Sequence, residues 1–301
     1  MTAVLIEEHP VTDARSGLYG VTTGPDDALW FTLAHSGRVG RMVPGTPPTT
    51  YLVDPAGQPT IIVAGPDGAL WFTESRAHRI SRITTDGDTT RFPVPSRGGG
   101  PYGIAPGPDG ALWFTEMNAD RIGRITTDGA ASDFPLPVTG AYPSAITAGP
   151  DGAMWFTMNQ ANAIGRIDMA GTVTVHPLPT DAAAPVGITA GPDGAVWFVE
   201  IAAGQIGRIT PAGAIAEFAL PDRAARPHAV TTGGGGDLWF TEWAGNRVGS
   251  ITTDGTIEVH DLPTPRSEPH GIALGPDGAL WTALENGALA RIGPAGRCRA
   301  V

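Results

Sequence analysis

Short apolar segments alternate with clusters of turn residues along the whole chain, and the alternation recurs at an almost constant interval. The phrase GPDGALWFTE begins at Gly65 and again at Gly107, about 42 residues later. Degenerate copies begin at Gly24, Gly149, Gly191, Gly233 and Gly275. Repeats of about 40 to 45 residues with short β-strand patterns are typical of β-propellers, with one four-stranded blade per repeat. The period predicts an all-β, seven-bladed β-propeller that occupies residues 1–301 as a single domain.

Residues 101–137 show how one blade is built. The segments 102–106, 111–116, 121–126 and 132–136 are separated by turn residues, which predicts four strands. In the GPDG turn, proline fixes φ at the second position and glycine supplies a positive φ. The proline within the last segment suits an edge strand, because proline cannot donate a hydrogen bond to a neighbouring strand. Each repeat is therefore expected to form one twisted antiparallel sheet.

The two ends of the chain are expected to share a blade. The last repeat contains three strand-like segments, the last ending near Ile292, and lacks a fourth. Residues 5–10 resemble the fourth-strand phrase at residues 256–261. An open ring would leave strand edges unpaired, which proteins avoid. We predict that the N-terminal strand closes the seventh blade from outside.

Charge and composition narrow the functional classes. The chain has 19 basic residues, all of them arginine, and a formal charge of −11, which argues against a nucleic-acid partner. No apolar run is long enough to span a membrane. The N-terminus lacks the features of a signal peptide, and one cysteine, Cys298, excludes an internal disulfide. We expect a cytoplasmic protein without a nucleic-acid or membrane partner.

Residues that recur in every repeat are expected to build the scaffold. The tryptophan six residues after each repeat glycine is predicted to pack between blades. Four glutamates share another register and are assigned a structural role: Glu74, Glu116, Glu200 and Glu242. Arginines of the third strand are candidates to pair with these carboxylates: Arg82, Arg124, Arg166, Arg208 and Arg291.

Departures from the repeat carry the functional signal. The position five residues before each repeat glycine starts the innermost strand, so its side chains are predicted to ring one mouth of the central channel. These residues vary and are mostly polar: Tyr19, Thr60, Tyr102, Ser144, Val186, His228 and His270. His228 and His270 occupy the same register of adjacent blades. Two readings stay open for them, a functional pocket or hydrogen bonding across the channel.

The seventh repeat departs furthest. Glu268 stands two residues before His270, and both side chains lie on one side if the segment is extended. Where four other repeats have glutamate, this repeat has Leu284 followed by Glu285, a shift of one residue that reverses the face in a strand. We predict that Glu268, His270, Glu285 and His228 meet at one channel mouth. The other five histidines, His35 among them, are assigned solvated structural roles.

These features resemble the virginiamycin B lyase family, the streptogramin B lyases. The resemblance covers the whole chain and rests on the repeated phrase together with residues 16–20, 226–228, 268–271 and 280–285. One departure is Thr282, where the other repeats have phenylalanine after tryptophan.

The resemblance implies a monomer that acts on small cyclic depsipeptide antibiotics with Mg²⁺. It implies His270 as the proton acceptor, Glu268 and Glu285 as magnesium ligands, His228 as a substrate contact, and Tyr19 as a wall of the pocket.

The implied reaction opens the lactone by elimination. A neutral imidazole is a suitable base for the Cα proton, and a cation held by carboxylates can stabilise the developing enolate. Two other functions stay open, because one fold hosts many activities. The first alternative to the lyase is a non-catalytic propeller that binds a peptide or glycan. The second is a metal-dependent lactone hydrolase. The inner register contains few acids, which disfavours the hydrolase, and the shifted Glu285 favours an enzyme over a scaffold.

Overall fold

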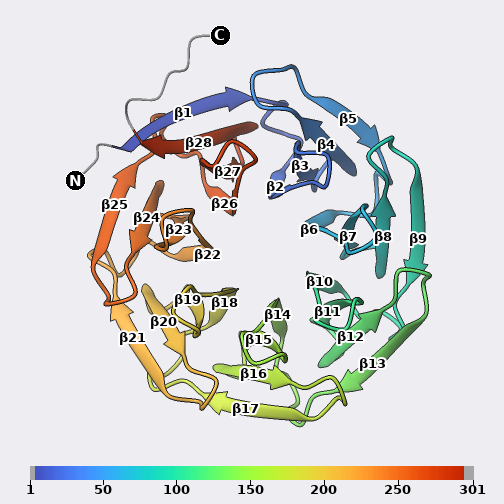
Figure 1. The fold of residues 1–301 in the computed structure, drawn as a ribbon, viewed down its shortest axis with the longest axis vertical. Helices are drawn as coiled ribbons and strands as arrows, with labels where there is room; N and C mark the ends of the chain where they lie inside the picture. Colours follow the sequence, from blue (N-terminus) through green and yellow to red (C-terminus); the bar gives the residue numbers. More distant parts are fainter. Residues whose placement is uncertain (1–3, 295–301) are drawn as a thin grey trace.

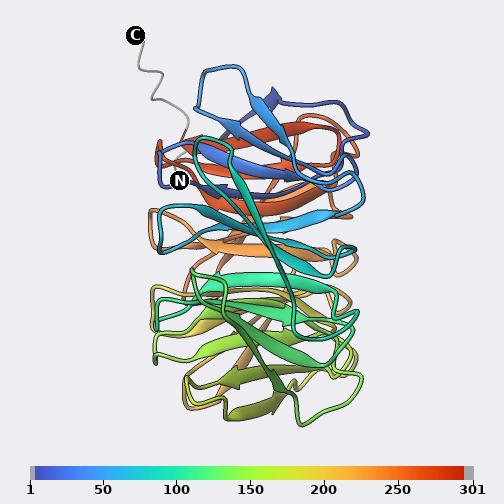
Figure 2. The same ribbon diagram turned by 90° about the vertical axis from the view of Figure 1, so that its right-hand side faces the viewer.

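The computed structural model describes residues 4–294, which form seven four-stranded antiparallel sheets arranged as blades around a central axis (Figure 1). The predicted seven-bladed β-propeller is therefore confirmed. Figure 2 shows the ring edge-on, with connecting loops on both faces. In the described part of the chain, no helix is long and apolar enough to cross a membrane.

Each blade presents one strand to the axis and one to the outside. The innermost strands are β2 (Leu18–Thr23), β6 (Pro59–Ala64), β10 (Pro101–Pro106), β14 (Pro143–Ala148), β18 (Pro185–Ala190), β22 (Pro227–Thr232) and β26 (Pro269–Leu274). The second strands are β3 (Leu29–Leu33), β7 (Leu70–Glu74), β11 (Leu112–Glu116), β15 (Met154–Met158), β19 (Val196–Glu200), β23 (Leu238–Glu242) and β27 (Leu280–Leu284). The third strands are β4 (Arg38–Met42), β8 (Arg79–Ile83), β12 (Arg121–Ile125), β16 (Ala163–Ile167), β20 (Gln205–Ile209), β24 (Arg247–Ile251) and β28 (Ala288–Pro294). The outermost strands are β5 (Thr49–Leu52), β9 (Thr89–Pro93), β13 (Ala131–Pro135), β17 (Val173–Pro177), β21 (Ile215–Ala219), β25 (Ile257–Asp261) and β1 (Val4–Pro10).

The N-terminal strand closes the ring as predicted. Strand β1 pairs antiparallel with β28, with Ile6 opposite Ile292, and so forms the outer edge of the seventh blade. The amide nitrogens of Val11 and Thr12 donate to the Gly287 carbonyl at 2.9 and 3.1 Å, which holds the chain as it leaves this strand. In Figure 1, β1 lies beside β28 although the two strands come from opposite ends of the sequence.

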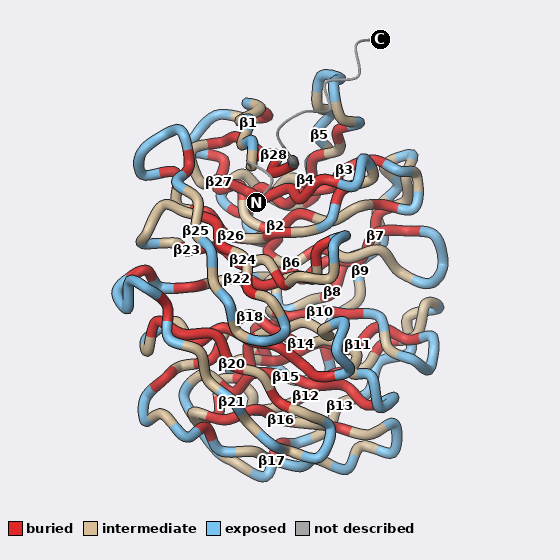
Figure 3. The backbone as a smooth tube through the Cα atoms, turned by 60° about the vertical axis from the view of Figure 1, so that its left-hand side comes forward, coloured by how far each residue is buried: buried red, intermediate tan, exposed pale blue. Residues whose placement is uncertain are grey.

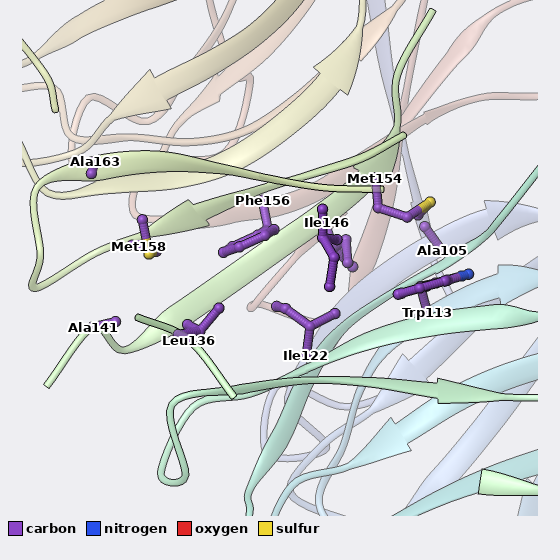
Figure 4. Packing of buried hydrophobic residues seen from close by; sticks show 11 residues of the cluster. Ala105, Trp113, Ile122, Leu136, Ala141, Ile146, Met154, Phe156, Met158 and Ala163 are labelled. Atoms are coloured by element: carbon purple, nitrogen blue, oxygen red, sulfur yellow. The ribbon is translucent and has the colours of Figure 1, made fainter. Parts of the chain in front are cut away.

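The core lies between neighbouring blades, and the repeated tryptophans occupy it. Trp113 of the third blade packs in one cluster with Met154 and Phe156 of the fourth blade (Figure 4). The second strands are almost entirely buried, whereas the outer strands and turns are exposed (Figure 3). Each buried aromatic side chain contributes roughly 1.5 to 3 kcal/mol of transfer free energy. The prediction of blade-to-blade packing is confirmed.

The expected pairing between third-strand arginines and the repeated glutamates is wrong. Arg82 Nε lies 2.6 Å from Asp67 Oδ2 in the GPDG turn, and Trp71 Nε1 donates to the other oxygen of the same carboxylate. Glu74 instead bonds Arg79, the first residue of the third strand. The reason is register, because Arg82 lies opposite Trp71 near the turn, whereas Glu74 stands at the far end of the strand.

Candidate active site

One backbone feature precedes every innermost strand and aims the next side chains at the channel. The residue just before each innermost strand lies in the left-handed region, with φ between 49° and 68°. These residues are Gly17, Gln58, Gly100, Tyr142, Ala184, Arg226 and Glu268. A bulge follows at the start of each innermost strand. The residues predicted to ring the channel therefore lie where the regular pairing with the second strand is interrupted. This construction gathers Tyr19, Tyr102, His228 and His270 at one end of the channel.

His270 and Glu285 form the predicted polar pair. His270 Nε2 lies 2.9 Å from Glu285 Oε2, and the imidazole is buried while the carboxylate is partly exposed. Glu285 is the first residue after β27 rather than a strand residue, and its amide donates to the Ser267 carbonyl at 2.8 Å. The one-residue shift in sequence therefore moves the carboxylate out of the strand and onto His270.

Glu268 reaches the site by a different route from the one expected. Its φ of 49° means that the segment before His270 is not extended, so the alternation argument does not apply. The half-buried Glu268 carboxylate nevertheless acts on His270, because its charge favours the protonated imidazole. A left-handed glutamate costs about 1 kcal/mol or more, a cost shared by the non-glycine residues at equivalent positions in four other blades.

Tyr19 connects the two histidines. Its ring lies 4.5 Å from the His270 ring between centroids, and its hydroxyl lies 3.3 Å from His228 Nε2. The centroids of the His228 and His270 rings are 5.1 Å apart. The Tyr19 hydroxyl also lies 2.5 Å from the hydroxyl of Tyr102, a residue to which the sequence analysis gave no role. Tyr19, His228 and His270 are thus brought together as predicted.

Burial keeps both histidines neutral at neutral pH. Burial lowers the pKa of His270 to about 4, against the opposing charge of Glu268. Burial also lowers the pKa of His228 to about 3, and the neighbouring His270 adds to this effect. Burial raises the pKa of the Tyr19 hydroxyl well above its ordinary value, and the adjacent Tyr102 reinforces the shift. The site therefore holds two uncharged bases and uncharged hydroxyl groups.

A cavity of about 300 Å³ opens beside this cluster. It is lined by Tyr19, Tyr102, His270 and Glu285 together with side chains that sequence reasoning missed. His35 is one of these: its side chain is exposed, in keeping with the solvated role assigned to it, yet it lines the cavity and acts to lower the pKa of His270. The others are Gln58, Ser75 and Met117. Ser75 and Met117, like Glu285, directly follow a second strand, and this shared register was the available signal.

A second cavity, of about 280 Å³, lies along the central channel and is lined by Tyr19, Tyr102 and His228. Because Tyr19 and Tyr102 line both cavities, their hydroxyl pair marks the boundary between the mouth and the channel. Thr282, the departure in the seventh blade, donates its hydroxyl to the Gly271 carbonyl at 2.9 Å. This bond supports the backbone next to His270 where the bulge interrupts the ladder.

The Glu285 carboxylate beside His270, with Glu268 acting on the same imidazole through its charge, supplies oxygen donors of the kind that Mg²⁺ uses. Within residues 4–294, no group of three or more histidine, cysteine, aspartate or glutamate side chains is placed to hold a metal. Mg²⁺ commonly uses only one or two carboxylates and completes its shell with water and substrate oxygens. Glu285 is 35% exposed and lines the cavity, and Glu268 acts on the same imidazole. This donor set suits Mg²⁺ better than zinc, which prefers nitrogen and sulfur ligands.

Several proteins of known identity are similar to this chain. The structure matches that of selenomethionine-substituted virginiamycin B lyase from Staphylococcus aureus with a TM-score of 0.93 and 42% identity, covering 96% of this chain and 99% of that one. A catalytically inactive histidine-to-alanine variant of the Staphylococcus aureus lyase, solved with quinupristin, gives the same values.

The sequence of the virginiamycin B lyase of Saccharopolyspora erythraea is 64% identical over 51 residues, a match that spans 17% of this chain and 17% of that relative. The model of the virginiamycin B lyase family matches residues 4–292, nearly the whole described part of the chain. The chain therefore belongs to the virginiamycin B lyase family.

Proposed function

We propose that this protein linearises streptogramin B-type cyclic depsipeptides by breaking the lactone C–O bond through elimination, with Mg²⁺ as cofactor. The observation that carries the proposal is the buried, neutral His270 beside Glu285 on the wall of a cavity, in a chain of this family. A structural neighbour at 42% identity is inactive when a histidine is replaced by alanine and was solved with quinupristin, which supports a histidine-dependent reaction on such a substrate.

His270 serves as the base in this proposal. It takes the Cα proton of the threonyl residue, the electron pair forms the Cα–Cβ double bond, and the ester carboxylate leaves from Cβ with the electrons of the C–O bond. We assign the proton to Nε2, because Nδ1 is buried while Nε2 lies beside the cavity-lining Glu285. Accepting a proton there requires the tautomer with hydrogen on Nδ1. The contact with Glu285 instead requires a hydrogen on Nε2, so the Glu285 carboxylate must move away from Nε2 before His270 acts as the base. Nearby carboxylates then stabilise the imidazolium.

The remaining side chains bind and orient the substrate. Glu268 and Glu285 would hold Mg²⁺, whose charge stabilises the enolate character that develops on the substrate carbonyl. His228 is held by Tyr19 and lines the channel cavity, so we assign it to substrate contact. The Tyr19 ring, which contacts the His270 ring at a tilt of 33°, orients the imidazole and forms a wall of the cavity.

A mass measurement tests the reaction class. The purified protein is incubated with a streptogramin B lactone and Mg²⁺, and the linear product is weighed by mass spectrometry. Elimination leaves the mass unchanged, whereas hydrolysis adds one water. A product heavier by one water would show that the protein is a lactone hydrolase and not a lyase. Absence of any product would favour a propeller that only binds its ligand.

A further inference from the structure

Six blades contain a three-residue unit near the GPDG turn. In the fifth blade, Asp193 Oδ1 accepts a hydrogen bond from Trp197 Nε1 at 3.1 Å, and Asp193 Oδ2 pairs with Arg208 Nε at 2.6 Å. The Arg208 guanidinium lies over the indole, 5.9 Å from the ring centroid. The equivalent aspartate–arginine pairs are Asp26–Arg41, Asp67–Arg82, Asp109–Arg124, Asp151–Arg166 and Asp277–Arg291.

The sixth blade keeps the tryptophan of this unit and lacks both of its partners. Trp239 lies opposite Ser250 where the other blades have arginine, and Gly235 stands where they have aspartate. Among residues 4–294 the indole N–H of Trp239 has no hydrogen-bond partner, and the side chain is only half-buried, unlike its six equivalents. The two losses occur together, so neither an unpaired aspartate nor an unpaired arginine is left behind.

A cavity of about 610 Å³ occupies this place, between the sixth blade and the seventh. Trp239, Ser250, Asp237 and Glu258 line it, and no arginine does within the described residues. Neither carboxylate pairs with a basic side chain in residues 4–294. The cavity thus offers an indole face, a hydroxyl and two acids. His260, whose ring stacks on Trp239, is the basic side chain among the described lining residues.

The seventh blade shows what such a set of side chains normally surrounds. Glu7 lies opposite Arg291 on the outer strand, just as Glu258 lies opposite Ser250. Arg291 reaches Glu7 at 3.7 Å and Asp277 at 2.7 Å. The sixth blade therefore retains the outer carboxylate and the indole of an arginine site while the arginine itself is missing.

This cavity is remote from the active site along the blade. His270 is the second residue of strand β26, whereas Gly278 of the turn that follows the end of β26 lines the cavity. The two sites therefore lie at opposite ends of this innermost strand. Figure 1 shows the two blades between which the cavity lies, β22–β25 and β26–β28 with β1. Changes in the cavity can be made without touching the proposed catalytic residues.

We propose that this cavity binds a small ligand through a guanidinium group. A planar, delocalised cation stacks on an indole face and donates hydrogen bonds to carboxylates in its own plane. Arg208 makes both kinds of contact in the fifth blade, and Arg291 pairs with two carboxylates in the seventh. The volume exceeds that of one guanidinium group and falls in the range of small-molecule sites. Anionic ligands are disfavoured by Asp237 and Glu258.

Calorimetric titration of the full-length protein tests ligand class. N-acetylarginine amide should bind with one-to-one stoichiometry and a dissociation constant of about 1 mM or lower. N-acetylcitrulline amide has the same shape without the charge, and N-acetyllysine amide has the charge without the plane, so each should bind at least about tenfold more weakly. Equal binding of the lysine compound would show that the cavity attracts any cation and does not recognise a guanidinium group, which would contradict the proposal. Absence of binding by the arginine compound would also overturn it.

Variants locate the binding. The double variant Gly235→Asp/Ser250→Arg rebuilds the pair of the other blades and should abolish binding, and a Cβ at Gly235 meets nothing within 4 Å. Glu258→Gln, on the exposed outer strand, keeps the test informative if the double variant fails to fold, and should weaken binding about tenfold. Both should leave lactone turnover unchanged. Unaltered binding in both variants would place the ligand elsewhere and sink the proposal.

The chain also carries Arg297 and Arg299, outside the described residues. Replacing both by alanine distinguishes an external ligand from an arginine of this chain. Unchanged affinity for N-acetylarginine amide supports the external ligand. Binding that appears only in the Arg297→Ala/Arg299→Ala variant would show that the site belongs to the chain's own terminal arginines, which would overturn the proposal.

Discussion

The Tyr19 hydroxyl lies 2.5 Å from the Tyr102 hydroxyl, so a side chain of the first blade meets one of the third blade across the axis of the ring. The same Tyr19 hydroxyl lies 3.3 Å from His228 in the sixth blade. Three blades that are separated in sequence are thereby joined at one point. This point divides the cavity at the mouth from the cavity in the channel.

Replacing Tyr102 by phenylalanine should loosen Tyr19 without removing a group that takes part in chemistry. Loss of one buried hydrogen bond costs about 1 kcal/mol, so we expect KM for a streptogramin B lactone to rise about fivefold while kcat changes less. Tyr51→Phe, on the outer strand where the ring stacks on Trp30, is the matched control and should leave both constants unchanged. A loss confined to kcat would show instead that Tyr102 acts in the chemical step.

The repeat predicts most of the fold because every blade packs against its neighbours through the same residue types at the same positions. The tryptophans and the closing β1 follow from period and strand pattern alone. The role of Tyr102 cannot be predicted from the sequence, because it depends on the distance between its hydroxyl and that of Tyr19 in another blade, which no local pattern encodes. The pairing of Arg82 was misassigned because strand register decides between Asp67 and Glu74, and the sequence shows both carboxylates nearby. The position of His35 beside the cavity follows from the fold of its loop, which the sequence pattern does not show.

His270→Ala should lower turnover of the lactone by about 100-fold or more, the usual scale for a positioned general base. Substrate binding, measured separately by calorimetry, should remain. His228→Ala should weaken binding more than it lowers turnover, because His228 is tied to the Tyr19 wall. If His228→Ala abolishes turnover while His270→Ala retains it, the two assignments must be exchanged.

Chelation of Mg²⁺ should stop turnover while the thermal unfolding midpoint stays the same, since the ring closes through β1 and β28 without an ion. Glu285→Gln and Glu268→Gln should both raise the Mg²⁺ concentration needed for half-maximal rate. A matched control is Glu258→Gln, a glutamate far from the mouth. Melting of the protein on chelation would make the metal structural and contradict the proposed role.

Glu116 should make stability fall as pH rises. Burial raises the pKa of this carboxyl to about 7 from an ordinary value of 4.5. Between these values the folded state keeps a proton that the unfolded state has lost, so the free energy of unfolding decreases with pH. Glu116→Gln should match the wild type near pH 5 and exceed it at pH 8 by up to about 3 kcal/mol.

Urea unfolding at the two pH values measures the effect of Glu116→Gln. Glu74→Gln is the control, because Glu74 in the same register is bonded to Arg79 and its replacement should destabilise the protein at pH 8. A Glu116→Gln variant that is less stable than the wild type at pH 8 would show that the ionised carboxylate has a partner that compensates its burial.

Within residues 4–294, two of the seven blades lack a hydrogen bond that ties neighbouring blades together at the channel. In the others a threonine two residues after the tryptophan donates to a carbonyl of the next innermost strand, as Thr157 does to Val186 at 2.7 Å. The exceptions are Val199 and Ala283, and the carbonyls left without this threonine belong by register to His228 and Tyr19. The interblade ties are therefore missing at two residues of the proposed site.

Val199→Thr should restore one such tie, because the two side chains have nearly the same shape. A Cβ placed on Gly187 would lie 2.7 Å from the His228 carbonyl oxygen and 3.3 Å from Val199 Cγ2, so both groups border the same space. We expect the free energy of unfolding to rise by about 1 kcal/mol, the net value of one hydrogen bond. Thr157→Val, which removes an existing tie, should lower it by a similar amount or more.

Turnover of the Val199→Thr variant should fall if substrate binding requires His228 to shift. Urea unfolding measures the effect on stability, and steady-state rates measure the effect on turnover. A destabilised Val199→Thr protein would mean that its hydroxyl finds no acceptor in the buried interface, and the carbonyl of His228 would then have to be satisfied in another way.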